Sequence, residues 1–87
     1  MKDKIVCVEW DDASFNSGYY DKKDKERFVP VKTKTAGFVI RSNRKSIIIS
    51  HDRFYDEQGN LDDERHITVI PRGMIRHITE LAEKPKK

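Results

Sequence analysis

The chain is poor in the features that stabilise many small proteins. It contains one cysteine among 87 residues, so no disulfide can form within the chain. Hydrophobic residues make up 36% and charged residues 38%, which leaves little apolar material for a core. A chain of this length buries only about 60–65% of its unfolded surface, so we expect one marginally stable domain. Multidomain enzymes, Rossmann halves and (β/α)-barrels are excluded by length.

Long apolar runs are also missing. The longest covers residues 5–8, far below the roughly 18–20 residues that span a bilayer. The amino terminus, Met1-Lys2-Asp3-Lys4, does not have a signal-peptide pattern and leads into a strand-like segment. We therefore expect a reduced, cytoplasmic protein without a membrane partner. Residues 1–83 are expected to form one domain, and residues 84–87 a disordered basic tail.

The charge balance leaves the partner open. Lys and Arg total 18 against 15 Asp and Glu, giving a net charge of +3 and a pI near 9.1. This pI reaches the value of about 9 that is typical of nucleic-acid-binding domains. Acidic residues are interspersed among the basic ones, which favours an ordinary solvated surface of mixed charge.

Short β-favouring runs alternate with polar stretches along the chain. The alternation of Ile5, Cys7 and Glu9 with Val6, Val8 and Trp10 indicates a strand that places Trp10 in the core. Gly37, inside a second run, predicts a bend, a bulge or a close backbone approach. The predicted strands are residues 4–11, 31–41, 47–49, 67–70 and 75–80.

The connections between these strands are predicted from turn-forming residues. A tight polar turn at 42–45 makes residues 37–50 a hairpin. Residues 56–65 are expected to form a long acidic loop with a turn at Gly59 and Asn60, and Pro71 and Gly73 should end the fourth strand. Residues 75–83 fit either a helix or a strand, and we expect a strand over 75–80. Five short strands with one strong bend predict a closed barrel, which would leave no exposed sheet edges.

Two stretches resemble the Sm-like family. They are Gly37-Phe38-Val39-Ile40-Arg41-Ser42-Asn43 and Ile70-Pro71-Arg72-Gly73-Met74-Ile75-Arg76-His77-Ile78. The resemblance implies a mainly β, small five-stranded, strongly bent antiparallel Sm-like or SH3-like barrel. It also implies a homo-oligomeric ring in which the fourth and fifth strands of neighbouring subunits pair.

The chain is also similar to short uncharacterised bacteriophage proteins that open with V-x-W-x-D-A and close with I-P-x-G-x-I. Residues 8–13 and 70–75 carry these patterns. This similarity implies a bacterial cell or an infected bacterial host as the setting.

The resemblance places the turn at 42–45 beside the connection between the fourth and fifth strands. Asn43, Arg44, Lys45 and Arg72 would then form a nucleic-acid-binding site. An amide can hydrogen-bond a base edge, and a guanidinium can stack on a base or contact a phosphate. Lys34 and Arg41 would add long-range attraction. The plainer interpretation is an ordinary polar turn beside an Arg that ends a strand.

Two functions follow from these patterns. The first is a non-enzymatic, oligomeric Sm-like protein that binds single-stranded RNA. The alternative is a phage-type oligomeric protein that binds or sequesters a nucleotide signal or a host protein. In the alternative, Tyr19 and Tyr20 would belong to the partner surface.

No metal, cofactor or enzymatic activity is expected. His51, His66 and His77 do not have the spacing of metal ligands, and Cys7 lies within an apolar strand. The sequence contains no glycine-rich phosphate loop and no nucleophile or metalloprotease motif.

Overall fold

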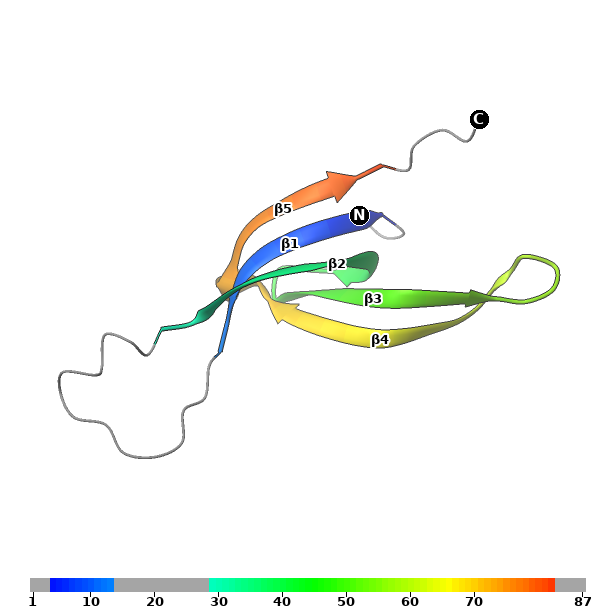
Figure 1. The fold of residues 1–87 in the computed structure, drawn as a ribbon, viewed down its shortest axis with the longest axis horizontal. Helices are drawn as coiled ribbons and strands as arrows, with labels where there is room; N and C mark the ends of the chain where they lie inside the picture. The colour runs from blue at the N-terminus through cyan, green and yellow to red at the C-terminus, as the bar shows by residue number, and fades with distance from the viewer. Residues whose placement is uncertain (1–3, 14–28, 83–87) are drawn as a thin grey trace, which may run out of the picture.

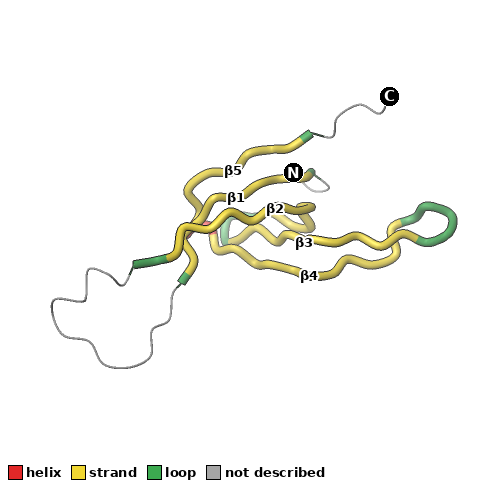
Figure 2. The backbone as a smooth tube through the Cα atoms, in the orientation of Figure 1, coloured by secondary structure: helices red, strands yellow, loops and turns green. Residues whose placement is uncertain are grey.

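The computed structural model describes residues 4–13 and 29–82, which form one five-stranded antiparallel sheet (Figures 1 and 2). The strands are β1 (Ile5–Asp12), β2 (Val31–Ser42), β3 (Ser46–Tyr55), β4 (Leu61–Pro71) and β5 (Ile75–Leu81), and a 3-10 turn, η2 (Arg72–Met74), joins the last two. Their order in the sheet is β4-β3-β2-β1-β5. The described residues contain no helix long and apolar enough to cross a membrane.

The bend in β2 determines the shape of the sheet. Residues 31–38 of β2 pair with β1, whereas residues 38–42 pair with β3. Figure 1 shows β2 turning back between these two parts, so that β5, β1 and the start of β2 lie over β3 and β4. A Cβ atom on Gly37 would lie 2.4 Å from the Ser50 carbonyl oxygen and 2.5 Å from Cγ2 of Ile49. The predicted close backbone approach at Gly37 is therefore confirmed.

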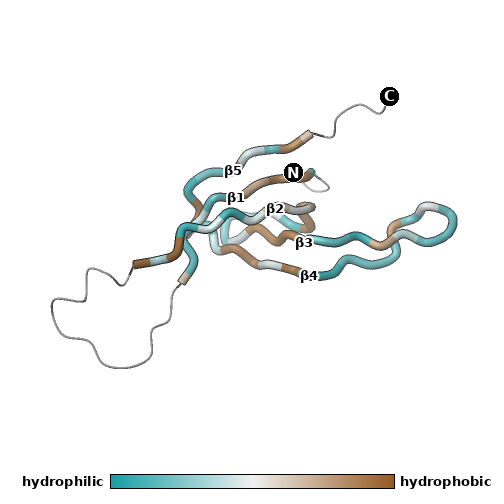
Figure 3. Tube along the Cα trace, in the orientation of Figure 1, coloured by the Kyte–Doolittle hydropathy of each residue, from teal (hydrophilic) through white to brown (hydrophobic). Residues whose placement is uncertain are grey.

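The core lies inside this bend. Its buried members are Val6, Val8, Trp10, Val39, Ile47, Ile49 and Ile70, and Ile75 and Ile78 pack against them. Burying an aliphatic side chain of this kind contributes about 1.5–3 kcal/mol. The predicted core position of Trp10 is confirmed, since it is only 9% exposed and its indole N–H donates to Thr35 Oγ1 at 3.0 Å. Figure 3 shows the same concentration of apolar residues in β1 and in the first half of β3.

The strand predictions need two corrections. The predicted acidic loop at 56–65 is wrong, because only residues 56–60 form a turn and β4 begins at Leu61. The third strand extends beyond residue 49 to Tyr55, because residues 52–55 pair with residues 61–65 across that turn. Antiparallel pairing therefore forms strands in a segment whose acidic composition is typical of a loop. The ambiguous last segment is a strand, as expected for residues 75–80.

The prediction of a closed barrel also needs correction, because the sheet is open. Within the described residues, β4 pairs only with β3, and β5 pairs only with β1. The two strands diverge from η2, so they do not form the ladder that would close a barrel (Figure 1). Both edges carry exposed apolar side chains, at Ile67 and Val69 on β4 and at Leu81 on β5.

Replacing Gly37 by Ala should destabilise the fold, because the new methyl group would clash with the main chain of β3. We expect a loss of about 1–3 kcal/mol in the free energy of unfolding, measured by urea denaturation. Gly73→Ala is the matched control, because its Cβ would have no atom within 4 Å. Equal stability of the two variants would contradict the role assigned to Gly37.

Candidate functional site

The turn between β2 and β3 is organised by the side chain of Asn43. Asn43 Oδ1 accepts hydrogen bonds from the main-chain N–H groups of Lys45 at 2.8 Å and Ser46 at 3.0 Å. The Asn43 N–H in turn donates to the Ser46 carbonyl oxygen at 3.0 Å. An Asn side chain that replaces a main-chain partner in this way stabilises a tight turn. The side-chain oxygen of Asn43 is thus occupied by the turn, while its amide nitrogen can still donate.

Arg72 ties the turn to η2. Its Nε donates to the Asn43 carbonyl oxygen at 2.9 Å, and its Nη2 donates to the Ser42 hydroxyl. Its main-chain N–H donates to the Lys45 carbonyl oxygen at 2.9 Å. The structure therefore brings Asn43, Lys45 and Arg72 together, with Arg44 between the first two in the chain. Much of the hydrogen-bonding capacity of Arg72 is used to hold the turn.

The cations on this turn differ from most others in the described chain. Arg41, Arg44 and Lys45 are exposed, and none has an ion-pair partner among residues 4–13 and 29–82. By contrast, the other strand arginines each pair with a carboxylate: Arg53 with Glu64, Arg65 with Asp63, and Arg76 with Asp11. The turn thus presents two unneutralised charges on a fixed main chain, and Arg41 adds a third at the end of β2.

The sequence contains a signal for this site that the overall charge balance hides. The stretch from Arg27 to His51 contains six Lys and Arg and no Asp or Glu. The following stretch, Asp52 to Arg65, contains six Asp and Glu and two Arg. Charge is therefore segregated along the chain, and counting it in consecutive windows would have revealed the basic segment.

The acidic stretch forms a projecting two-stranded ribbon, residues 51–65, which we call the arm (Figure 1). Arg53 Nε donates to Glu64 Oε1 at 2.6 Å across the two strands. Arg53 also lies 4.5 Å above the Phe38 ring centroid, which fixes the base of the arm to β2. At the tip, Asp56 Oδ1 accepts from the N–H groups of Gln58 and Asn60, so the turn is well defined.

Gly59 and Arg65 complete the arm. Gly59 has a φ of 85°, which favours glycine, and it lies in the turn predicted at Gly59 and Asn60. Arg65 lies 4.5 Å from the Phe54 ring centroid and donates to Asp63, and this hydrogen bond lowers the pKa of the Asp63 carboxyl. Because the folded-state pKa is lowered, this contact stabilises the fold above the unfolded pKa, and the contribution disappears as the pH falls through the folded pKa.

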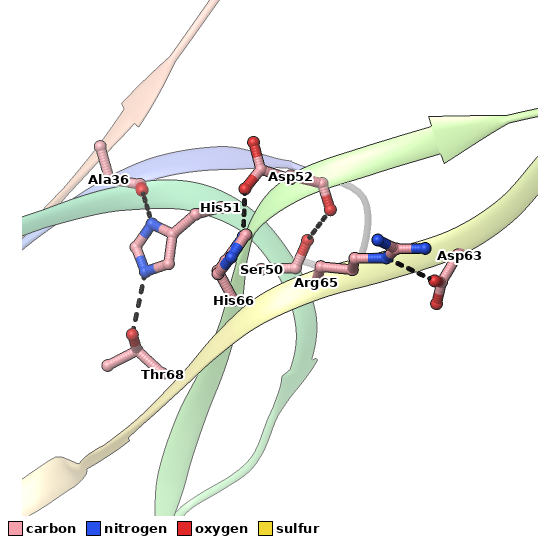
Figure 4. A network of polar contacts seen from close by, with 8 residues as sticks. All are labelled: Ala36, Ser50, His51, Asp52, Asp63, Arg65, His66 and Thr68. Atoms are coloured by element: carbon pink, nitrogen blue, oxygen red, sulfur yellow. Dashed lines mark hydrogen bonds and ion pairs between the residues drawn. The ribbon is translucent and has the colours of Figure 1, made fainter.

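A polar network occupies the place where β3 leaves β2 (Figure 4). His51 Nδ1 lies 2.8 Å from the Ala36 carbonyl oxygen, and Nε2 lies 2.9 Å from Thr68 Oγ1. A carbonyl oxygen only accepts, so Nδ1 must carry the hydrogen. His51 thereby links β2 to β4 beyond the last main-chain pairing of β2 with β3.

Opposite His51, His66 has a φ of 60° and its Nδ1 contacts the Asp52 carboxylate. Within the described residues, no three His, Cys, Asp or Glu side chains are arranged to hold an ion. Cys7 is half-buried in β1.

A shallow depression of about 520 Å³ lies at the far end of the β1–β2 ribbon. It is lined by Glu9, Trp10, Asp11, Lys32, Thr33, Lys34 and Arg76. Asp11 pairs with Arg76 at 2.6 Å, and Glu9 pairs with Lys34 at 3.9 Å. These carboxylates neutralise two of its three cations, so the depression attracts anions less than the turn does. Tyr19 and Tyr20, the predicted partner surface, lie outside the described residues.

Comparisons with known proteins do not place the chain in a family. No family model matches it, and neither a curated protein nor a solved structure shows significant similarity.

The structural role of Asn43 can be tested by two substitutions. Asn43→Ala removes the acceptor for two main-chain N–H groups and should lower the free energy of unfolding by about 1 kcal/mol. Asn43→Asp keeps an acceptor oxygen and should lose less, as measured by urea denaturation of both variants. Equal losses would show that the turn does not depend on this acceptor.

Proposed function

We propose that the protein is a non-enzymatic, oligomeric RNA-binding protein whose binding surface is the turn at 42–45. The observation that carries this proposal is a group of three unpaired cations. Arg44 and Lys45 lie on the turn that Asn43 and Arg72 hold, and Arg41 lies beside it at the end of β2. Because the main chain of the turn is already fixed, binding a polyanion costs little additional main-chain entropy. More of the attraction between the charges therefore contributes to the affinity.

The chemistry of the turn suits single-stranded RNA. Arg44 supplies a planar cation that can stack on a base or contact phosphate, and Lys45 supplies a point charge. The Asn43 amide nitrogen can donate to a base edge or a phosphate oxygen. One copy offers few contacts, but several copies arranged around an axis would multiply them and raise the affinity.

The Sm-like arrangement that the sequence resembles supports assembly of such copies. The strongly bent β2 and the open edges at β4 and β5 fit a subunit that continues its sheet into a neighbour. Exposed Ile67 and Val69 on one edge and Leu81 on the other are hazardous on a solitary chain. Pairing β4 of one copy with β5 of the next would cover both edges and produce a closed ring.

Replacing Arg44 and Lys45 by Gln should weaken binding of a single-stranded RNA oligomer. Each lost phosphate contact reduces the slope of log affinity against log salt concentration by about 0.7, so we expect a fall of about 1.4 in the slope. Fluorescence anisotropy across a salt series measures both the affinity and the slope.

The double variant Lys4→Gln with Lys32→Gln is the matched control, because it also removes two positive charges. Both lysines are exposed and have no ion-pair partner among the described residues. An equal effect of the two double variants would show that only net charge matters. Salt-insensitive binding of a nucleotide or a protein, without RNA affinity, would instead favour the sequestering protein.

Assembly through the sheet edges predicts a native mass that is a multiple of 10.3 kDa. Val69→Lys should shift the protein towards the monomer, because it places a charge on the exposed face of the β4 edge. Val31→Lys is the matched control, since Val31 is 53% exposed and Val69 56%, but Val31 lies on β2. Light scattering at micromolar concentration measures the mass, and a monomeric parent protein would contradict the assembly.

A further inference from the structure

The face of the sheet opposite the core is apolar beside the cationic turn. Ile47 and Ile70 are buried in the core. Side chains of a strand alternate between the two faces of a sheet, so their neighbours Ile48 and Val69 lie on the outer face. Arg41 is directly opposite Ile48, and Ile48 is directly opposite Val69, which makes one row across β2, β3 and β4. This row sets an exposed arginine beside two aliphatic side chains.

A second row extends the same surface towards the arm. Phe38, Ser50 and Ile67 are opposite one another on the same three strands. Ser50 and Ile67 are each two positions from a member of the first row, so they lie on the same face. Ile67 is 47% exposed and Val69 is 56% exposed, although both are aliphatic. We call Ile48, Ile67 and Val69 the outer apolar patch.

The strand segments that form this surface do not contain a carboxylate side chain. Residues 31–51 and 66–75 include Lys, Arg and His but neither Asp nor Glu. The surface therefore combines apolar side chains with positive charge alone. It is complementary to a ligand that has flat, uncharged faces and a negatively charged backbone. An unpaired nucleic-acid strand has this chemistry.

We propose that the outer apolar patch contacts the bases of a single-stranded RNA whose phosphates bind at Arg41 and the turn. This inference rests on the proposed function, because it takes the cationic turn as the phosphate-binding end of the surface. Proteins that bind unpaired strands commonly combine a cationic track with a platform for the bases. The platform here is aliphatic, so it contributes apolar contact with unpaired bases and cannot reach bases that are stacked inside a duplex.

The shape of the patch favours bases over a lipid surface. Ile48 is half-buried in β3, and the exposed members, Ile67 and Val69, have short side chains. Segments that enter a bilayer interface present Trp, Phe or Leu side chains that project into the lipid. The patch has none of these residues, whereas a planar base can lie against it.

The patch stays accessible in the assembly that we propose. Pairing of β4 with a neighbouring strand uses N–H and C=O groups in the plane of the sheet, whereas side chains stand roughly perpendicular to it. Base contact and edge pairing can therefore coexist on β4.

A tryptophan placed on the patch reports base contact directly. The fluorescence of Val69→Trp should be quenched by a short single-stranded oligouridine, because bases stack on an indole. Val31→Trp is the matched control, since Val31 is 53% exposed but lies at the start of β2, away from the patch. Both variants keep Trp10, which is only 9% exposed, so a difference between them comes from the new residue. Annealing the oligouridine to oligoadenosine keeps the phosphates and should abolish the quenching.

Removing apolar groups from the patch tests their contribution to affinity. Ile67→Thr with Val69→Thr should raise the dissociation constant for oligouridine about threefold to tenfold. The slope of log affinity against log salt concentration should not change, because no phosphate contact is lost. Leu61→Thr with Val31→Thr is the matched control, since Leu61 and Ile67 are both 47% exposed and Leu61 lies at the far end of β4. Fluorescence anisotropy across a salt series measures both quantities.

This inference and the proposed function fail in different ways. If Arg44→Gln with Lys45→Gln weakens RNA binding but either patch variant behaves like its control, the base contact is refuted and the cationic turn stands. A lower salt slope in the patch threonine variant would also refute it, because charge contacts would then have been lost. A blue shift of Val69→Trp on phosphatidylserine vesicles, without a response to oligouridine, would assign the patch to a lipid surface instead. A parent protein that does not bind RNA refutes both.

Discussion

The close approach of β2 to β3 at Gly37 is the constraint on which the rest of the structure depends. With so few apolar residues, the chain can enclose a core only by wrapping one sheet around it, and the wrapping is done by β2. At the crossing, the Gly37 backbone lies against the Ser50 carbonyl, where a Cβ atom cannot fit. β4 and β5 are the open edges of this bent sheet, and the main-chain pairing of β3 with β2 ends at Ser50. Beyond Ser50, His51 and Arg53 contact β2 through their side chains. The close contact at Gly37 thus permits the bend in which the core is enclosed.

Basic and acidic residues are separated along the chain and lie at opposite ends of β3. The basic residues of β2 lead into the turn at 42–45, and the acidic residues occupy the arm at the other end of β3. β3 therefore connects a cationic end to an anionic end, while its middle contributes Ile47 and Ile49 to the core.

The sequence predicts those elements whose signal is local. Alternation in β1, the break at Pro71 and the polar turn at 42–45 are recognisable from neighbouring residues, and they match the structure. The arm was missed because its acidic residues indicate a loop, and only cross-strand contacts such as Arg53 with Glu64 and Arg65 with Phe54 make it a ribbon. Such contacts join residues that are 11 apart in sequence, so no local pattern reports them.

The candidate site was only partly predictable, because only some of its features are local in the sequence. Basic residues at 44 and 45 are visible in the sequence, and the resemblance placed Arg72 beside them. The interlocking of Arg72 with the main chain of Asn43 and Lys45 depends on the path of η2, which the sequence does not specify. The prediction of closure was wrong because the direction in which β4 and β5 leave η2 depends on the whole core.

Arg72 connects two parts of the structure. It lies in η2, between the edge strands β4 and β5, and its guanidinium donates hydrogen bonds to the turn. The Arg72 main-chain N–H also donates to the Lys45 carbonyl oxygen, so both the side chain and the main chain of this residue connect the turn to η2. If a ligand binds the turn, as we propose, its binding and the geometry of the edges would be coupled through these contacts, and such coupling is reciprocal. In the assembly and the RNA binding that we propose, pairing at the edges would therefore strengthen binding at the turn, and binding at the turn would strengthen the pairing.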